Sequence, residues 1–318
     1  MEGITGYVFR NVHRAMTKDV DTYYAPFVQA KQTHVFQTRE IKDNAPENNR
    51  GLSLVPQILT NAIEEFNWAA RELLAMGHET VNLNLGCPMP TVVTRHKGSA
   101  MLADPNNLRR FLDGIFAPHD RPRISIKTRL GFDNLDNAES LMDLFNDYPV
   151  ELLIIHPRCQ KELYNGQAHL DIFLSCLKRS TLDVCYNGDI FSTKDYDTLI
   201  QATRSFPQLK AVMIGRGANA NPMIFREIHG GPKLTLDELH AYHDAVFDAY
   251  IRYYPDYTTV LHKMKELWFY LGSMFLNCDK KVHKIRISKT VEELRSRADL
   301  IWQDAVISEY PRCAYCSP

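Results

Sequence analysis

The sequence predicts an α/β protein, a (β/α)8 TIM barrel whose first strand is missing or truncated, followed by a C-terminal helical domain. Three observations lead to this fold class. Seven short apolar runs start at residues 21, 53, 80, 123, 151, 182 and 209, segments with helical periodicity lie between them, and the strand-like runs stop after about residue 230. Regular alternation of strands and helices indicates a parallel sheet with helical crossovers.

The predicted strands are short and rich in apolar, β-forming residues. The segments between them, such as 62–77 and 138–148, repeat apolar residues at helical spacing. Parallel strands joined by right-handed helical crossovers satisfy both patterns. In chain order the predicted strands are DTYYAPFV (21–28), SLVPQI (53–58), TVNLNL (80–85), RISIKTRL (123–130), ELLIIHP (151–157), LDVCYNG (182–188) and LKAVMIG (209–215).

The number of strands bears on the choice between an open doubly wound sheet and a closed barrel. A barrel needs eight strands, and seven are visible. The chain opens on MEGITG, a loop-like stretch that leads into a predicted helix at 7–16. An eighth strand would therefore belong just before Met1, and we favour a barrel with its first strand absent or severely shortened.

The pattern changes after residue 230, which predicts a catalytic domain at 1–230 and a helical domain at 231–318. HGGPKLT (229–235) has the glycines and proline of a linker. Three amphipathic helices are predicted at 236–254, 260–275 and 291–306, with no strand between them. Between the second and third lies the basic run CDKKVHKIRISK (278–289), which taken alone is most simply a solvated surface.

Composition indicates a globular protein without a membrane segment. With 318 residues, 45% of them hydrophobic and 24% charged, the chain can bury one large core and a smaller second one. No run approaches the roughly 18 apolar residues that cross a bilayer, and the N-terminus lacks the layout of a secretory signal. Seven scattered cysteines fit reduced thiols in the cytoplasm. Cys313 and Cys316 form a lone CxxC, which predicts a plain tail because zinc would need a second pair.

Polar residues or glycines follow six of the predicted strands, at the end where barrels place their active sites. Each one alone is an ordinary turn or core residue. Six such positions at equivalent strand ends make it a poor interpretation that all of them are ordinary turn or core residues. The residues are Gln57, Asn84 with Cys87, Lys127 with Arg129, His156 with Arg158, Asn187-Gly188-Asp189, and Gly215-Arg216-Gly217.

The last two groups predict a phosphate site. NGD and GRG place backbone N–H groups beside a guanidinium, where barrels often bind phosphate. Lys127 is expected on the opposite side of the barrel mouth, and the amides of Gln57 and Asn84 suit a flat heterocycle. Flavin mononucleotide (FMN) fits this arrangement, because its ring becomes anionic on reduction and needs a fixed cation. A sugar-phosphate isomerase would share the phosphate site, but it would more often show a Glu or His base and has no evident need for Cys87.

The segments LNLGCPMPTVVTRHKGSAML, KTRLG, HPR, NGDI and MIGRGANANP resemble, in order, the tRNA-dihydrouridine synthases. The opening MEGITG is similar to the segment after that family's first strand. The resemblance covers roughly residues 1–230, and the C-terminal helices are similar in kind to the family's tRNA-binding domain. It implies that Cys87 is catalytic and that FMN is the cofactor. The residues it implies for FMN are Gln57, Asn84, Lys127, His156, Asn187, Gly188, Asp189, Gly215 and Arg216.

Three features depart from the family pattern. Of the usual first strand ending in Ala-Pro-Met, only Met1 remains. The glycine-rich stretch before Ser-Ala-Leu reads HKGSAM here, with His96 and Lys97 in place of smaller residues. The lysine often found after the Cys-Pro is replaced by Thr91, which leaves Arg95 as the nearest cation.

Cys87 has a chemical reason to stand at a rigid Gly-Cys-Pro corner. Reduction of the uracil 5,6 double bond needs a hydride at carbon 6 and a proton at carbon 5. A thiol with the ordinary pKa near 8.5 is mostly protonated at neutral pH and is able to act as that acid. The alternative is a small apolar residue that fills a gap.

The resemblance implies tRNA as the partner and NADPH or NADH as the reductant, in a cytoplasmic protein that we expect to be a monomer. The target uracil must leave its stack to enter the barrel, while basic residues hold the phosphates. Two alternatives remain: a dihydroorotate-dehydrogenase-like barrel acting on a small pyrimidine, and a non-catalytic RNA-binding relative without flavin. The residues expected to contact tRNA are Arg95, Arg129, Lys280, Lys281, Lys284 and Arg286.

Overall fold

The computed structural model describes residues 1–303 and 305–311, so Cys313 and Cys316 lie outside the described residues. The chain divides into two compact units. The barrel unit comprises residues 24–188 and 199–213, and the helical unit comprises residues 1–23, 189–198 and 214 onward. This division does not follow the linear boundary at residue 230, because the first helix packs in one core with the C-terminal helices. The assignment of catalysis to 1–230 and tRNA binding to 231–318 stays a prediction.

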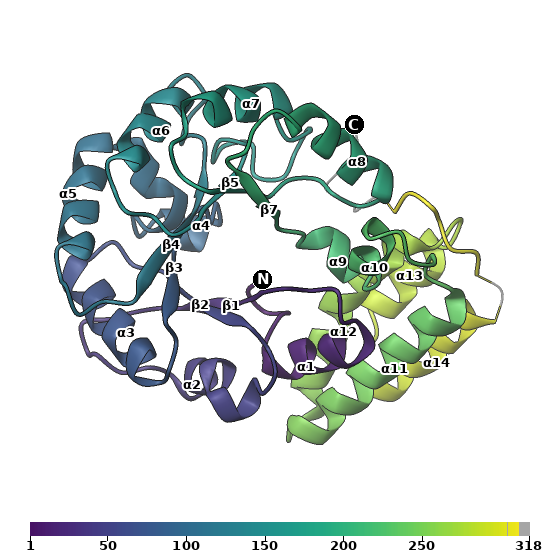
Figure 1. Cartoon of the computed structure of the whole chain (residues 1–318). Coiled ribbons are helices and arrows are strands. Elements are labelled where there is room, and N and C mark those ends of the chain that lie inside the picture. The colour runs from purple at the N-terminus through teal and green to yellow at the C-terminus, as the bar shows by residue number, and fades with distance from the viewer. Residues whose placement is uncertain (304, 312–318) are drawn as a thin grey trace. The chain divides into compact units, whose positions relative to one another are not determined.

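Seven strands form one sheet in the order of the sequence, and the pairings from β2 through β7 are parallel. Figure 1 shows the sheet curling inside a ring of helices that includes α3, α5, α6 and α7. All seven predicted strands are confirmed, with ends displaced by a few residues. They are β1 (Tyr23–Val28), β2 (Leu54–Ile58), β3 (Thr80–Leu85), β4 (Arg123–Arg129), β5 (Leu153–His156), β6 (Val184–Tyr186) and β7 (Leu209–Val212).

No strand precedes the first helix in the described chain, as the sequence predicts. Met1 to Gly6 form turns, in which the N–H groups of Ile4 and Thr5 donate to the Met1 carbonyl (3.4 and 3.1 Å). The sheet order ends at β1 on one side and at β7 on the other. β7 is the least buried of the seven strands, as expected at an edge. The order is that of a (β/α)8 barrel with one strand fewer.

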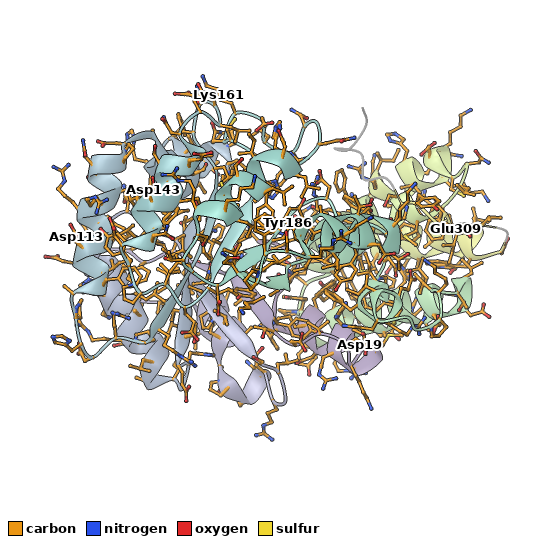
Figure 2. The ribbon with its side chains drawn as sticks, turned by 45° about the horizontal axis from the view of Figure 1, so that its top comes forward. Asp19, Asp113, Asp143, Lys161, Tyr186 and Glu309 are labelled. Carbon is orange, nitrogen blue, oxygen red and sulfur yellow. The ribbon has the colours of Figure 1, made fainter. Side chains whose placement is uncertain are left out.

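Apolar side chains in matching register form the interior of the barrel unit. Leu83 of β3 pairs with Ile126 of β4, which pairs with Leu153 of β5, and none of the three has exposed surface. Asp113 and Asp143 lie on the outer helices in Figure 2, whereas Tyr186 of β6 is buried. The helices of the barrel unit are α2 (Thr38–Asn44), α3 (Ile63–Ala75), α4 (Pro90–Val93), α5 (Pro105–Phe116), α6 (Ala138–Asn146) and α7 (Leu170–Arg179). The residues of α8 (Thr193–Thr203) are divided between the two units.

The helical unit has its own apolar core. Trp268 is fully buried, and its indole N–H donates to Nε2 of the buried His243 (3.2 Å). His243 Nδ1 in turn lies 2.9 Å from the Asp244 carboxylate, so the chain of polar groups ends at a charge near the surface. The helices are α1 (Tyr7–Met16), α9 (Arg216–Ala220), α10 (Ile224–Ile228), α11 (Leu236–Tyr253), α12 (Tyr257–Leu271), α13 (Asp279–Arg286) and α14 (Val291–Trp302).

The three predicted C-terminal helices are confirmed as α11, α12 and α14, and the structure adds a fourth. The basic run between the second and third predicted helices forms α13, which the sequence pattern did not distinguish from a loop. It has one buried apolar residue, Ile285, and a single residue cannot show the 3.6-residue spacing of a helix. No helix in the described part of the chain is both long enough and apolar enough to span a lipid bilayer.

Candidate active site

A chain of buried polar side chains runs across β2, β3 and β4. Gln57 Nε2 donates to Asn82 Oδ1 (2.8 Å), and Asn84 Nδ2 donates to Gln57 Oε1 (2.8 Å). Asn82 Nδ2 donates in turn to Ser125 Oγ (3.0 Å). These bonds fix the orientation of each amide and use one N–H of each. The second N–H of Gln57 and of Asn84 has no partner among the residues that the structure describes, which suits both amides to binding a ligand.

The loop that carries Cys87 is held at its backbone. Asn84 Oδ1 accepts from the N–H groups of Gly86 (3.1 Å) and Cys87 (2.9 Å). The Cys87 carbonyl accepts from the N–H (3.2 Å) and the hydroxyl (2.8 Å) of Ser99. Gly98 makes this contact possible, because its φ is +60° and a Cβ there would lie 2.8 Å from the Cys87 carbonyl oxygen. The glycine retained in HKGSAM is therefore a packing requirement of the Cys87 loop.

The Cys87 side chain is half-buried in a small apolar cluster. It packs against Phe27, Leu59 and Val92, which come from β1, from the segment after β2 and from α4. Cys87 and the other described cysteines are not in disulfides. The thiol thus has a defined environment on one side while part of the residue stays accessible at the strand ends.

Lys127 on β4 is a desolvated cation without a partner among the described residues. Its ammonium makes no hydrogen bond or ion pair with any residue that the structure describes. The pKa of Lys127 is lowered from 10.5 to about 8, mainly by burial and also by the nearby Arg129, whereas Cys185 and Cys87 act in the opposite direction. A cation held in this way is suited to an anionic ligand, because a ligand charge would supply the missing partner.

Arg129, at the end of β4, is buried and structural. Only 1% of it is exposed, and its guanidinium donates to the carbonyls of Gly86 (3.0 Å), Cys159 (2.8 Å) and Leu163 (2.6 Å). The guanidinium also lies 5.3 Å from the ring centre of Tyr164. These contacts argue against the predicted direct contact with tRNA and in favour of holding two loops together.

His156 and Arg158 form a buried pair after β5. Arg158 Nη1 donates to His156 Nε2 (3.0 Å), which places the proton of a neutral imidazole on Nδ1. The other guanidinium nitrogens of Arg158 donate to the carbonyls of Asn165 (3.2 Å) and Gly166 (2.6 Å). His156 is therefore oriented by Arg158, and Arg158 also organises the following loop.

The residues predicted to bind phosphate fall in both units. Asn187 and Gly188 belong to the barrel unit, where Asn187 Nδ2 donates to the Met213 carbonyl (2.8 Å). Asp189, Gly215 and Arg216 belong to the helical unit. The predicted ring-side residues Gln57, Asn84, Lys127 and His156 all belong to the barrel unit.

In the helical unit Arg216 is already paired. Its Nη2 donates to Asp189 Oδ1 (2.5 Å), the two side chains are 10% and 22% exposed, and the guanidinium lies 5.6 Å from the ring centre of Phe191. Asp189 therefore orients Arg216. The sequence pattern predicts both residues as phosphate ligands and does not predict this ion pair. Gly215 immediately precedes α9.

Two glycines in these segments are required by close approach. A Cβ on Gly188 would lie 2.1 Å from the Tyr186 hydroxyl oxygen, and one on Gly217 would lie 2.0 Å from the Ile190 carbonyl oxygen. Gly217 is the residue of the GRG motif that sequence reasoning left without a role. Glycine is required at position 217 because the Ile190 carbonyl lies against it. This structural reason holds whether or not a ligand also needs the space.

The remaining residues expected at tRNA are on the surface. Arg95 is exposed, and its guanidinium has no partner in the described residues. On α13, Lys280 and Lys284 are exposed, with ammonium groups that pair with no described residue. Lys281 is half-buried and donates to the Leu300 carbonyl (3.1 Å), and Arg286 lies 4.7 Å from the ring centre of Phe269.

A sequence model of the family described as dihydrouridine synthase (Dus) matches residues 1–293. The chain belongs to the dihydrouridine synthase family. The GCP, KTR, NGD and GRG segments described above all lie within the matched residues.

Individual members of the dihydrouridine synthase family align over different lengths. A tRNA-dihydrouridine synthase B of Pseudomonas syringae pv. tomato is 32% identical over 50% of this chain and 46% of its own length. A probable tRNA-dihydrouridine synthase 1 of Synechocystis is 26% identical over 72% and 62%, and one of Helicobacter pylori is 26% identical over 92% and 89%. The chain thus spans less than two thirds of the first two relatives. Among solved structures, a variant of NCR from Zymomonas mobilis aligns over 73% of this chain and 83% of its own, with a TM-score of 0.49 and 12% identity.

Sequence reasoning missed the residues of this family member that support the site from outside the strand ends. Asn82 and Ser125 lie within β3 and β4, where a polar residue reads as one more position of an alternating strand. Ser99 and Gln160 act from other loops, and only the folded chain brings them to the Cys87 loop. The available signal was the period of two in TVNLNL, which places Asn82 and Asn84 on one face of β3.

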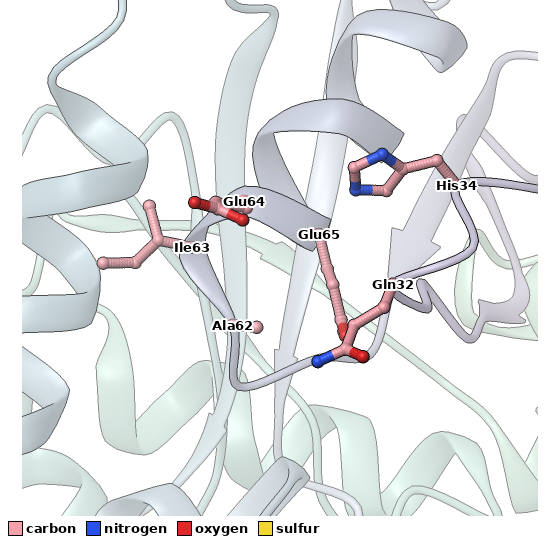
Figure 3. Close-up of a pocket in the computed structure, with 6 residues that line it drawn as sticks. All are labelled: Gln32, His34, Ala62, Ile63, Glu64 and Glu65. Atoms are coloured by element: carbon pink, nitrogen blue, oxygen red, sulfur yellow. The ribbon is translucent and has the colours of Figure 1, made fainter.

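The barrel unit of this family member also has a hollow of about 360 Å³ after β1 and β2. Figure 3 shows Gln32, His34, Glu64 and Glu65 around it. Glu65 is held there by the Thr60 hydroxyl (2.5 Å) and lies 3.6 Å from the Lys97 ammonium. Two of its six lining residues, Glu64 and Glu65, are acidic, and none is a predicted FMN residue. Through Lys97 it joins the segment between Cys87 and Ser99 to α3.

Proposed function

We propose that this protein reduces specific uridines of tRNA to 5,6-dihydrouridine, with FMN as cofactor and NADPH or NADH as reductant. The observation that carries the proposal is the backbone-anchored Cys87 at the strand ends, within electrostatic range of the partly buried Lys127, in a chain of the dihydrouridine synthase family. The names of the relatives support tRNA as the substrate.

The residues at the strand ends fit FMN by their chemistry. Gln57 and Asn84 each offer one amide N–H at a fixed orientation, and Lys127 offers a positive charge that nothing in the described chain neutralises. His156 is fixed by Arg158 at the end of the neighbouring strand. The sequence motifs NGD and GRG assign the phosphate to Asn187, Gly188, Asp189, Gly215 and Arg216, whose backbone N–H groups and guanidinium are donors suited to an anion. The Asp189 carboxylate contributes by orienting Arg216.

Cys87 supplies the proton. When bound and reduced, FMN supplies the hydride for carbon 6 of the uracil. The Cys87 S–H bond breaks as the C–H bond at carbon 5 forms, and the resulting thiolate takes a proton from water before the next turnover. Lys127 lies close enough to Cys87 to interact with it electrostatically, so its positive charge also stabilises the thiolate that proton transfer leaves behind.

The surface cations are assigned to the RNA. Lys280 and Lys284 on α13, with Lys281 and Arg286 beside them, form a basic helix whose two exposed lysines have no partner in the described chain. Such groups gain by pairing with phosphates and releasing counterions. Arg95, four residues beyond Thr91 on the Cys87 loop, is assigned to phosphates next to the target nucleotide. We expect the protein to act as a cytoplasmic monomer, where tRNA is available.

The test is product formation on tRNA that lacks dihydrouridine. Purified protein with NADPH should convert uridine in that tRNA to dihydrouridine, detected by mass spectrometry of nucleosides. Cys87→Ser should abolish the product while the preparation remains yellow. Equal turnover of a free pyrimidine without tRNA would favour the small-molecule alternative, and a colourless preparation that binds tRNA would favour a non-catalytic relative.

A further inference from the structure

We propose that Ser99 and Gln160 are positioning residues that hold the Cys87 thiol in place for proton transfer. The proposal rests on the proposed function, in which Cys87 is the acid. Neither residue lies at a strand end, and each reaches the Cys87 loop from a different part of the barrel unit. They act through the backbone, so they affect the reaction only through the placement of the sulfur.

The peptide groups around Cys87 are anchored from four directions. The Cys87 N–H donates to Asn84 Oδ1 (2.9 Å), and the Gly86 carbonyl accepts from Arg129 Nε (3.0 Å). The Cys87 carbonyl accepts from the Ser99 hydroxyl (2.8 Å). The Pro88 carbonyl accepts from Gln160 Nε2 (3.2 Å). Three consecutive carbonyls are therefore each bonded to a different side chain, which is far more than a turn needs for its own stability.

Ser99 and Gln160 differ from the other two anchors in what they do elsewhere. Asn84 is also part of the amide chain to Gln57, and Arg129 also holds Cys159 and Leu163, so their removal would disturb several features at once. The Ser99 hydroxyl and the Gln160 amide have the Cys87 loop as their hydrogen-bonding partner. Substituting Ser99 or Gln160 should therefore change the position of the thiol without disturbing other features of the site.

The position of the thiol matters because proton transfer is sensitive to distance. A displacement of about 1 Å from a reactive arrangement is able to cost on the order of 10²-fold in rate. With either anchor removed, the loop keeps its remaining hydrogen bonds and the rate should fall by roughly 10-fold or more. FMN binding and flavin reduction by NADPH should not change, because neither step uses the thiol.

The experiment measures reoxidation of the reduced enzyme by tRNA after rapid mixing. Ser99→Ala and Gln160→Ala are each made in the Cys87 enzyme and in the Cys87→Ser enzyme, and Gln160→Glu keeps the shape of glutamine but removes the donor. Ser180→Ala and Gln208→Ala are matched controls from the opposite end of the barrel unit. Ser180 is buried and donates to the Leu182 carbonyl (3.2 Å), and Gln208 donates to the Ser180 carbonyl (3.4 Å).

We expect each anchor variant to slow reoxidation about 10-fold or more with Cys87 present and to have no further effect in the Cys87→Ser background. The controls should leave the rate unchanged. Equal slowing in both backgrounds would mean that the anchors act on something other than the thiol, and no slowing would mean that the loop needs neither. A Gln160→Glu variant as fast as wild type would exclude the donated hydrogen bond. Each of these three results overturns the proposal.

A second measurement does not depend on turnover. The rate of alkylation of Cys87 by iodoacetamide, followed at the Cys87 peptide by mass spectrometry, should rise at least about threefold in the anchor variants, because the loop then opens more often. The controls should react like wild type. If Cys87→Ser reoxidised normally, the acid role in the proposed function would fail. The alkylation rates would then still decide whether Ser99 and Gln160 hold the thiol.

Discussion

Some residues of the site lower the stability of the folded protein, and the rest of the fold compensates for this loss. Lys127 is the clearest example, since its ammonium is desolvated, pairs with no described residue and has a second positive charge, that of Arg129, nearby. A side chain selected for stability alone would be apolar at this position. The unfavourable charge is therefore an argument that Lys127 serves a ligand, because functional residues are commonly retained at a cost in stability.

Replacing Lys127 with Met should stabilise the flavin-free protein at neutral pH. The pKa in the folded state is about 8 and lies below the unfolded value of 10.5, so the folded state disfavours the charged form. The cost is fully present below pH 8 and disappears as the pH rises toward 10.5. The free energy of unfolding in urea should rise by roughly 1–3 kcal/mol at pH 7, with little gain at pH 10.5. FMN affinity should fall in the same variant. Lys178→Met, at an exposed position, is the control, and a variant no more stable at pH 7 would contradict the buried-charge argument.

Individual elements are joined by a few polar side chains at the strand ends. Arg129 connects the end of β4 to the Cys87 loop and to the loop after β5 by donating to three carbonyls. In the helical unit, Arg226 bonds Glu238 (2.7 Å) and connects α10 to the start of α11. Arg129 thus gives the two loops beside Cys87 a defined course, and Arg226 does the same for the segment between α10 and α11.

Replacing Arg129 with Met should destabilise the protein strongly. Three buried carbonyls would lose their donor, and each unsatisfied group costs about 1–3 kcal/mol. We expect the free energy of unfolding to fall by about 3–5 kcal/mol in urea titrations. Arg123→Met, at the exposed start of the same strand, removes ion pairs with Glu79 and Glu151 and should cost about 1 kcal/mol or less. Similar losses in the two variants would show that Arg129 is not the anchor described here, and direct contact with tRNA would need to be reconsidered.

Helix α13 is held in place by apolar residues on one side, whereas the side chains of its exposed lysines pair with no residue that the structure describes. Ile285 fixes it to the helical core, and Val282 packs against that core, whereas Lys280 and Lys284 face solvent without partners in the described chain. The two lysines are one helical turn apart and so lie on one face of α13.

The double variant Lys280→Ala/Lys284→Ala should weaken tRNA binding without affecting flavin chemistry. Losing two phosphate contacts should raise the Kd for tRNA several-fold near 0.1 M salt and reduce the slope of log K against log salt by up to about 2. Flavin reduction by NADPH should be unchanged. Lys178→Ala/Lys210→Ala, which removes two exposed lysines from the barrel unit, is the matched control. An unchanged salt slope in the test variant would exclude α13 from the protein surface that contacts tRNA.

At the scale of the whole molecule, the alternation of strands and helices was enough to predict the sheet order. Each strand needs only a local apolar run, and parallel connection follows from the helices between them. The residues at the strand ends were predictable for the same reason. The division into units was not, because the packing of α1 with the C-terminal helices joins segments more than 200 residues apart, and no local pattern records such contacts. The roles of Arg129 and Ser99 likewise depend on contacts between separate segments and could not be predicted either.

The proposed reaction consists of two half-reactions, and Cys87→Ser should separate them. Serine nearly matches cysteine in size but is a far weaker acid. The loop anchors hold the backbone and do not involve the sulfur, so the variant should keep its FMN. Reduction by NADPH should proceed at the wild-type rate because it needs no proton from residue 87. Reoxidation by tRNA should slow by about 10²–10⁴-fold, the usual contribution of a general acid. Rapid mixing measures both rates in one preparation. Reoxidation as fast as in wild type would exclude Cys87 as the acid, and loss of flavin would show that its packing against Phe27 and Leu59 is what the site requires.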